Sequence, residues 1–105
     1  MKAMKAMKPD AVIKVRFLTT EEGGRESAIE GERYGCPIMV DGHGFDCRFV
    51  LTGATRFDLG ETYKIEVKFL NSESAMNELE IGTMISLWEG KTIAEGKILT
   101  LLSAS

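Results

Sequence analysis

Apolar residues recur at every second position in three stretches of this chain. Within residues 11–18, 45–51 and 63–69, charged residues fill most of the alternate positions. Successive side chains of a β-strand point to opposite faces, so this spacing predicts strands with one apolar and one solvated face. Residues 84–88 and 92–102 are rich in isoleucine and leucine and predict two further strands.

Glycines and acidic residues mark the turns between these strands. Glu22-Gly23-Gly24 opens a long loop, and Asp41-Gly42-His43-Gly44 is typical of a hairpin turn. The reason is that glycine, with aspartate or asparagine, tolerates positive φ most easily. We expect two more turns at Leu59-Gly60-Glu61 and Glu89-Gly90-Lys91.

Two features break the alternation. The polar residues 71–78 predict a crossover with one helical turn, capped by Ser72 or Ser74. Gly96 interrupts the last expected strand, and a glycine there is typical of a bulge or of a second backbone that passes close by.

About six short strands with one apolar face each predict an all-β fold. A closed barrel hides the apolar faces and removes free sheet edges, and a two-sheet sandwich is the nearest alternative. The 105 residues suit one domain. We therefore expect a disordered tail over residues 1–10 and a single barrel domain over residues 11–105.

The composition, with 44% hydrophobic and 28% charged residues, is that of a soluble globular protein. A net charge of −3 disfavours a dedicated nucleic-acid binder, whose affinity comes largely from basic side chains. No apolar run approaches the roughly 18–20 residues that span a bilayer. Lysines at every third position of the first eight residues interrupt any secretory signal. We expect a cytoplasmic protein without a membrane partner.

Two cysteines flank the expected hairpin. Cys47 shares an apolar face with Phe45 and Phe49, which predicts a buried, unreactive thiol with a raised pKa. A disulfide between Cys36 and Cys47 fits a hairpin, but the cytoplasm disfavours it.

His43 is the only histidine, and it lies in the same hairpin. Nucleophilic catalysis needs a nucleophile with a base in reach, and a lone histidine in a turn is normally solvated. Asp41, His43 and Asp46 could hold a metal, but acidic residues are common in turns for conformational reasons. We expect no catalytic site, no metal and no cofactor.

Several segments together resemble a known family. They are VIKVRFL with the following TTEEGGR, then LGETYKIEVKFL, the pair Ala75-Met76, and EGKTIAEGKI. This pattern, over residues 11–99, resembles the C-terminal β-barrel domain of elongation factor Tu. The resemblance implies a closed six-stranded antiparallel barrel with Greek-key connections. No GxxxxGK[ST] phosphate loop is present in the sequence, so we expect no binding of GTP.

The resemblance also implies candidate binding residues, because in that family the barrel contacts the T-stem of aminoacyl-tRNA. It places Arg25 beside the RNA backbone and Glu89 at a base. Ile38 replaces a glutamine of the family and cannot hydrogen-bond a base, and Trp88 replaces an arginine. The candidates for binding RNA or a partner are Arg25, Glu89, Trp88, Lys91, Gly23 and Gly24.

Three further patterns bear on function. The run Gly23-Gly24-Arg25 could bind an anion through backbone N–H groups and the guanidinium. Lys14 and Arg16, with Lys64 and Lys68, would form a basic stripe if their strands are neighbours, although a solvated outer face is the commoner reading. Trp88 is either a partner-binding side chain or a cap of the barrel end.

Two hypotheses about function follow. The first is a non-catalytic protein-binding accessory or decoy related to translation. The second is a tRNA-binding accessory that keeps part of the T-stem contact surface. An enzyme has no supporting arrangement of residues in the sequence.

Overall fold

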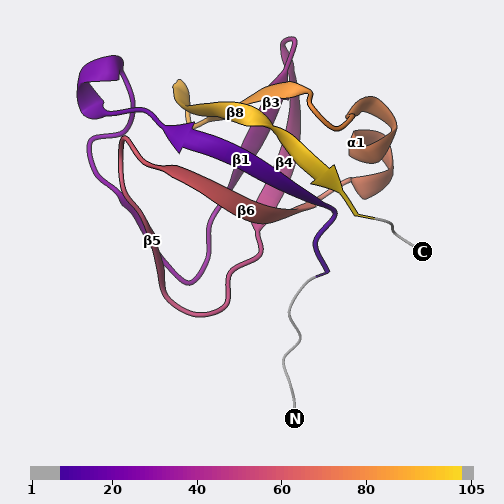
Figure 1. The fold of residues 1–105 in the computed structure, drawn as a ribbon, viewed down its shortest axis with the longest axis horizontal. Helices are drawn as coiled ribbons and strands as arrows, with labels where there is room; N and C mark the ends of the chain where they lie inside the picture. Colours follow the sequence, from indigo (N-terminus) through magenta and orange to yellow (C-terminus); the bar gives the residue numbers. More distant parts are fainter. Residues whose placement is uncertain (1–7, 103–105) are drawn as a thin grey trace.

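The alternating stretches become strands of a closed antiparallel barrel in the computed structural model, which describes residues 8–102 (Figure 1). The barrel strands are β1 (Ala11–Phe17), β3 (Gly35–Val40), β4 (His43–Phe49), β6 (Thr62–Phe69), β7 (Met84–Trp88) and β8 (Thr92–Leu101). Their order around the barrel is β1-β6-β4-β3-β7-β8, and β1 closes the ring by pairing with both β6 and β8. The expected six-stranded antiparallel barrel is confirmed.

A second, two-stranded sheet was not predicted. It consists of β2 (Ile29–Gly31) and β5 (Thr55–Phe57), which pair antiparallel with Ile29 opposite Phe57. Three residues are too few to show an alternation. Both apolar residues of this pair are buried, and the Phe57 ring lies 5.6 Å from the Phe17 ring. The small sheet therefore extends the core of the barrel rather than forming a separate unit.

The core follows the period of two. Along β1, the four residues that alternate with Lys14 and Arg16 are buried. Burial of each large apolar side chain contributes about 1.5–3 kcal/mol. A slip of one residue in register would expose the whole set, so this pattern fixes the pairing of the strands. The largest fully buried side chains are Phe17, Phe69, Ile13, Ile38, Leu87, Ile93, Ile98, Val15 and Val67.

The crossover holds helix α1 (Ser72–Glu78), which is longer than the single turn expected. Its cap is Asn71, whose side-chain oxygen accepts a hydrogen bond from the N–H of Ser74 at 3.2 Å. The predicted caps, Ser72 and Ser74, are therefore wrong. Only Ala75 of the helix is buried, which explains why the sequence shows no helical period.

Asp10 belongs to the barrel, although we expected the disordered tail to include it. Its carboxylate accepts hydrogen bonds from the N–H of Phe69 at 2.9 Å and the hydroxyl of Ser72 at 2.7 Å. The ammonium group of Lys68 lies 3.4 Å away. Asp10 thus joins the start of β1 to the end of β6. Lys8 and Pro9 have no regular secondary structure, and residues 1–7 of the expected tail lie outside the described residues.

Gly96 marks a close approach between backbones, one of the two expected readings. A Cβ atom at this position would lie 1.8 Å from the carbonyl oxygen of Lys14 in β1. The register shifts of β8 fall elsewhere, against Val12 and Ile13 of β1 and at Leu87 and Trp88 of β7. Within residues 8–102, no helix has the length and apolar character needed to cross a membrane.

Replacing Asp10 by asparagine should lower the free energy of unfolding by about 1–3 kcal/mol at pH 7, because buried donors lose a charged acceptor. Burial opposes ionisation of this carboxyl. The hydrogen bonds from Ser72 and Phe69 and the charge of Lys68 outweigh burial, so the pKa of Asp10 lies below its ordinary value of 3.8. Urea unfolding of both proteins measures the difference.

The effect should also depend on pH. A carboxyl with a lowered folded-state pKa stabilises the fold above its unfolded pKa, and this stabilisation is lost as the pH falls through the folded pKa. The gap between wild type and Asp10→Asn should therefore shrink below about pH 4. Glu73→Gln, at an exposed position of α1, is the matched control and should change stability by less than about 0.5 kcal/mol. A gap that stays equal down to pH 2 would contradict this account.

Candidate functional site

The loop after β1 and the turn between β7 and β8 meet through Arg25 and Glu89. The Arg25 Nη1 atom lies 2.8 Å from Oε1 and 2.6 Å from Oε2 of Glu89. The hydroxyl of Tyr34 donates a hydrogen bond to the same carboxylate. Burial and this hydrogen bond raise the pKa of the Tyr34 phenol, which keeps it protonated as a donor. The two residues that the resemblance singled out thus contact each other across 64 positions of sequence.

Local turn geometry places Arg25. Thr19 caps the short 3-10 helix η1 (Thr20–Glu22) with a capping box, and the chain leaves this helix through Gly23 with φ of 95°. Gly24 packs so closely on Leu18 that a Cβ atom would lie 2.4 Å from the Leu18 carbonyl oxygen. Both glycines therefore shape the turn that carries Arg25.

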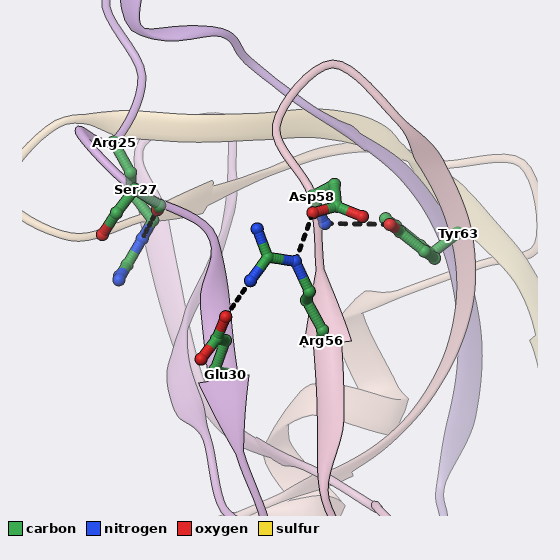
Figure 2. Close-up of polar contacts among 6 residues, drawn as sticks. All are labelled: Arg25, Ser27, Glu30, Arg56, Asp58 and Tyr63. Atoms are coloured by element: carbon green, nitrogen blue, oxygen red, sulfur yellow. Dashed lines mark hydrogen bonds and ion pairs between the residues drawn. The ribbon is translucent and has the colours of Figure 1, made fainter.

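The same turn argues against an anion site at the two glycines. The N–H of Gly23 donates to the carbonyl of Thr20 at 3.0 Å, and that of Gly24 donates to the carbonyl of Thr19 at 2.9 Å. Neither N–H is free to meet an anion. The Arg25 guanidinium is also engaged, because its Nε donates to the carbonyl of Ser27 at 3.0 Å (Figure 2). These internal hydrogen bonds argue against an anion cradle at Gly23-Gly24-Arg25.

Trp88 ends β7 directly before this ion pair, and 42% of its surface is exposed. The turn that follows is closed by a hydrogen bond from the N–H of Glu89 to the carbonyl of Lys91 at 2.8 Å. Gly90, between them, has φ of 75°, which favours glycine. Glu89 and Trp88 are therefore presented by a turn that the Arg25 contact holds in place.

Other exposed apolar side chains gather near Trp88 in the sequence. The large hydrophobic residues exposed among the described residues are Leu70, Ile81, Met84 and Trp88. Three of these four fall within residues 81–88. Met84 is not among the candidates that the sequence predicts. The buried positions of Ile85 and Leu87 imply by alternation that residues 84, 86 and 88 face outward, so a signal for it was present.

The two cysteines lie opposite each other in the β3–β4 register, and both are free and buried. The Cys47 thiol donates to the carbonyl of Cys36 at 3.3 Å. Burial raises the pKa of Cys47 to about 12 and that of Cys36 to about 11. The predicted buried and unreactive thiol at Cys47 is confirmed, because a thiolate is the nucleophilic form.

His43 is the first residue of β4 rather than part of the turn, which consists of Asp41 and Gly42 with φ of 48° and 83°. It lines an open groove of about 390 Å³ beside α1, together with Asp46, Leu70 and Glu78. Among residues 8–102, no group of three or more His, Cys, Asp or Glu side chains is arranged to hold a metal ion.

A second polar cluster holds the small sheet together (Figure 2). Arg56 of β5 pairs with Glu30 of β2, and its Nε lies 2.5 Å from Oδ1 of Asp58. The N–H of Asp58 donates to the hydroxyl of Tyr63 at 2.8 Å. All three charged side chains are at least half exposed. The cluster is satisfied internally, which is typical of a structural contact.

The structure defines the chain as a closed six-stranded antiparallel β-barrel whose long loop is fixed to the β7–β8 turn by an ion pair. No protein-family model matches the chain, and no curated protein matches it. The resemblance to the elongation factor domain therefore depends on the sequence segments quoted above.

The Arg25–Glu89 pair should contribute to stability as a coupled unit. Because both side chains are only 25% and 30% exposed, a double-mutant cycle with Arg25→Ala and Glu89→Ala should give a coupling energy of about 0.5–2 kcal/mol. The same cycle on Arg56 and Glu30, which are more than half exposed, is the matched control and should give less than about 0.5 kcal/mol. Urea unfolding supplies both values. Additive effects at Arg25 and Glu89 would show that the contact does not hold the loop.

Proposed function

We propose that this chain is a non-catalytic protein-binding module, an accessory or decoy related to translation and resembling the C-terminal barrel of elongation factor Tu. Its partner contacts the outward side of β7. The observation that carries the proposal is the gathering of Ile81, Met84 and Trp88 within eight residues of a chain whose other large apolar side chains are mostly buried.

These side chains have the properties of interface residues. Tryptophan is enriched among residues that dominate binding energy, and methionine adapts to irregular partner surfaces. A partner that covers the exposed part of Trp88 removes apolar surface from water, which contributes favourably to the free energy of binding. The adjacent turn is held by Arg25, Glu89 and Tyr34, so little conformational freedom is lost when Trp88 is bound.

The closed barrel restricts how a partner can bind. All six barrel strands are paired on both sides, so a peptide cannot extend the main sheet as an added strand. Recognition must instead use side chains on the outer faces and in the loops. Met84 and Trp88, exposed at the two ends of β7, are side chains of this kind.

The alternative, a tRNA-binding accessory, has less support. Its principal cation, Arg25, is neutralised by Glu89, and the whole chain carries a net charge of −3. Both features reduce the attraction to phosphates that supplies most affinity for nucleic acid. Lys91 remains as an exposed cation beside this pair.

Replacing Trp88 by alanine should weaken partner binding at least about tenfold, the loss expected for a central interface residue. The assay is affinity capture from a lysate of the source organism, divided into RNase-treated and untreated halves, with the captured protein and RNA quantified in each. Leu70→Ala removes another exposed apolar side chain, away from residues 81–88, and should leave capture unchanged. Circular dichroism and thermal melting show whether both variants keep the barrel.

Two outcomes would contradict the proposal. Equal capture by wild type and Trp88→Ala would remove β7 from the interface. Capture that yields tRNA and disappears after RNase treatment would favour the RNA-binding alternative.

A further inference from the structure

Three lysines lie side by side across neighbouring strands of the barrel. Lys64 of β6 is opposite Lys14 of β1, and Lys14 is in turn opposite Lys97 of β8. Figure 1 shows β8, β1 and β6 side by side, with β1 in the middle. All three side chains are exposed. We call these three residues the lysine row.

The lysine row is a concentration of positive charge without direct ion pairs to the described part of the chain. Like charges directly opposite each other on neighbouring strands repel and destabilise a sheet. Among the described residues, no carboxylate lies within ion-pairing distance of these lysines. The nearest acidic side chains by register are Glu66, opposite Val12, and Glu95, opposite Arg16. Diagonal neighbours of this kind are separated by about 7–8 Å, which long side chains can span. These two carboxylates therefore offset part of the charge, although neither forms an ion pair with the three lysines in this structure.

An apolar side chain continues the lysine row on the next strand. Met84 of β7 is opposite Lys97, and 71% of its surface is exposed. Strands lie about 4.8 Å apart, so the backbones of Met84 and Lys64 are separated by three strand spacings, or about 14 Å. The path over the side chains is longer because the outside of the barrel is convex. An extended peptide of about five to eight residues covers it.

We propose that the lysine row and Met84 bind an acidic, extended protein segment that crosses β7, β8, β1 and β6 and places an apolar side chain on Met84. Its carboxylates lie over Lys97, Lys14 and Lys64 and relieve their mutual repulsion. The inference rests on the proposed function, because it gives the chemistry of the partner that contacts the outward side of β7.

The composition of this surface favours an acidic protein segment over RNA. The three charged positions of the row are lysines rather than arginines, whose forks bind phosphate in two places. Arg16, on the same face of β1, is engaged with Glu22 at 3.0 Å. Trp88, on which a base could stack, lies at the other end of β7 from Met84. Met84 offers apolar contact that a ribose-phosphate backbone does not use. The net charge of the whole chain is −3, so residues outside the lysine row would repel a long polyanion. A short acidic segment contacts only the lysine row.

The test is titration of the full chain with a fluorescent eight-residue peptide that has one leucine followed by alternating aspartate and glutamate. Lys14→Gln should weaken binding about threefold to tenfold at low salt, because Lys14 lies at the centre of the lysine row. Met84→Ser should also weaken it about threefold or more, through the lost apolar contact. Arg48→Gln removes the same charge from the outer face of β4 and should change affinity less than about twofold.

Controls on the peptide and on stability complete the test. A peptide with asparagine and glutamine in place of the acids should not bind, and 0.5 M salt should abolish most of the binding. Lys14→Gln should leave the melting temperature equal or higher, because it removes a repulsion. A weaker fold would show instead that Lys14 has a structural role and would overturn the account of the lysine row.

Other outcomes would overturn the inference in distinct ways. Absence of peptide binding at 1 mM, or an equal loss in Arg48→Gln, would remove the lysine row as a specific site. Tighter, Lys14-dependent binding of poly(U) RNA would make it an RNA site. If the peptide result fails while Trp88→Ala still abolishes capture, only this inference is lost. If the peptide binds as expected while wild type and Trp88→Ala capture equal amounts of partner, the proposed function fails and the lysine row remains a binding site for acidic segments.

Discussion

The pairing of β1 with both β6 and β8 is the constraint on which the rest of this structure depends. It closes the sheet, so each barrel residue faces either the core or the outside. The close approach of Gly96 to the Lys14 backbone makes the β1–β8 pairing possible, because any side chain there would collide with β1. Asp10 fixes the start of β1 against the end of β6. Contacts at the start and in the middle of β1 thus support the closure of the barrel.

Closure also determines what the outer surface can do. It removes edges on which another strand could add, and it leaves binding to side chains that alternate with the core. The same register that buries Ile13 and Val15 aligns the lysines of three strands on the outside. On β7, the register that buries Ile85 and Leu87 turns Met84 and Trp88 outward. The proposed apolar and basic surfaces are therefore direct consequences of the pairing that builds the core.

Local patterns in the sequence predicted five of the six barrel strands, because alternation reports the face of each residue without reference to its neighbours in space. The remaining strand, β3, was implied only by the hairpin turn that follows it. The expected bounds of β7, residues 84–88, agree with the structure. The small β2–β5 sheet was missed because three-residue strands carry no period. The Arg25 and Glu89 positions were singled out separately, but their contact spans 64 residues and depends on the η1 turn. The sequence brings Lys14 and Lys64 together only if β1 and β6 are neighbours, as they are. The addition of Lys97 depends on the register between β1 and β8, which no single stretch of sequence reveals.

The central claim is that a protein partner covers the outward side of β7. Site-specific photo-cross-linking from Ser86, which lies between Met84 and Trp88 on that strand, tests it most directly. The same photoreactive residue at Thr52, exposed in the loop between β4 and β5, is the reference position. In cells of the source organism, position 86 should give one discrete, RNase-resistant protein adduct that position 52 does not give. Adducts that are equal at both positions, or an RNA adduct at position 86, would contradict the account.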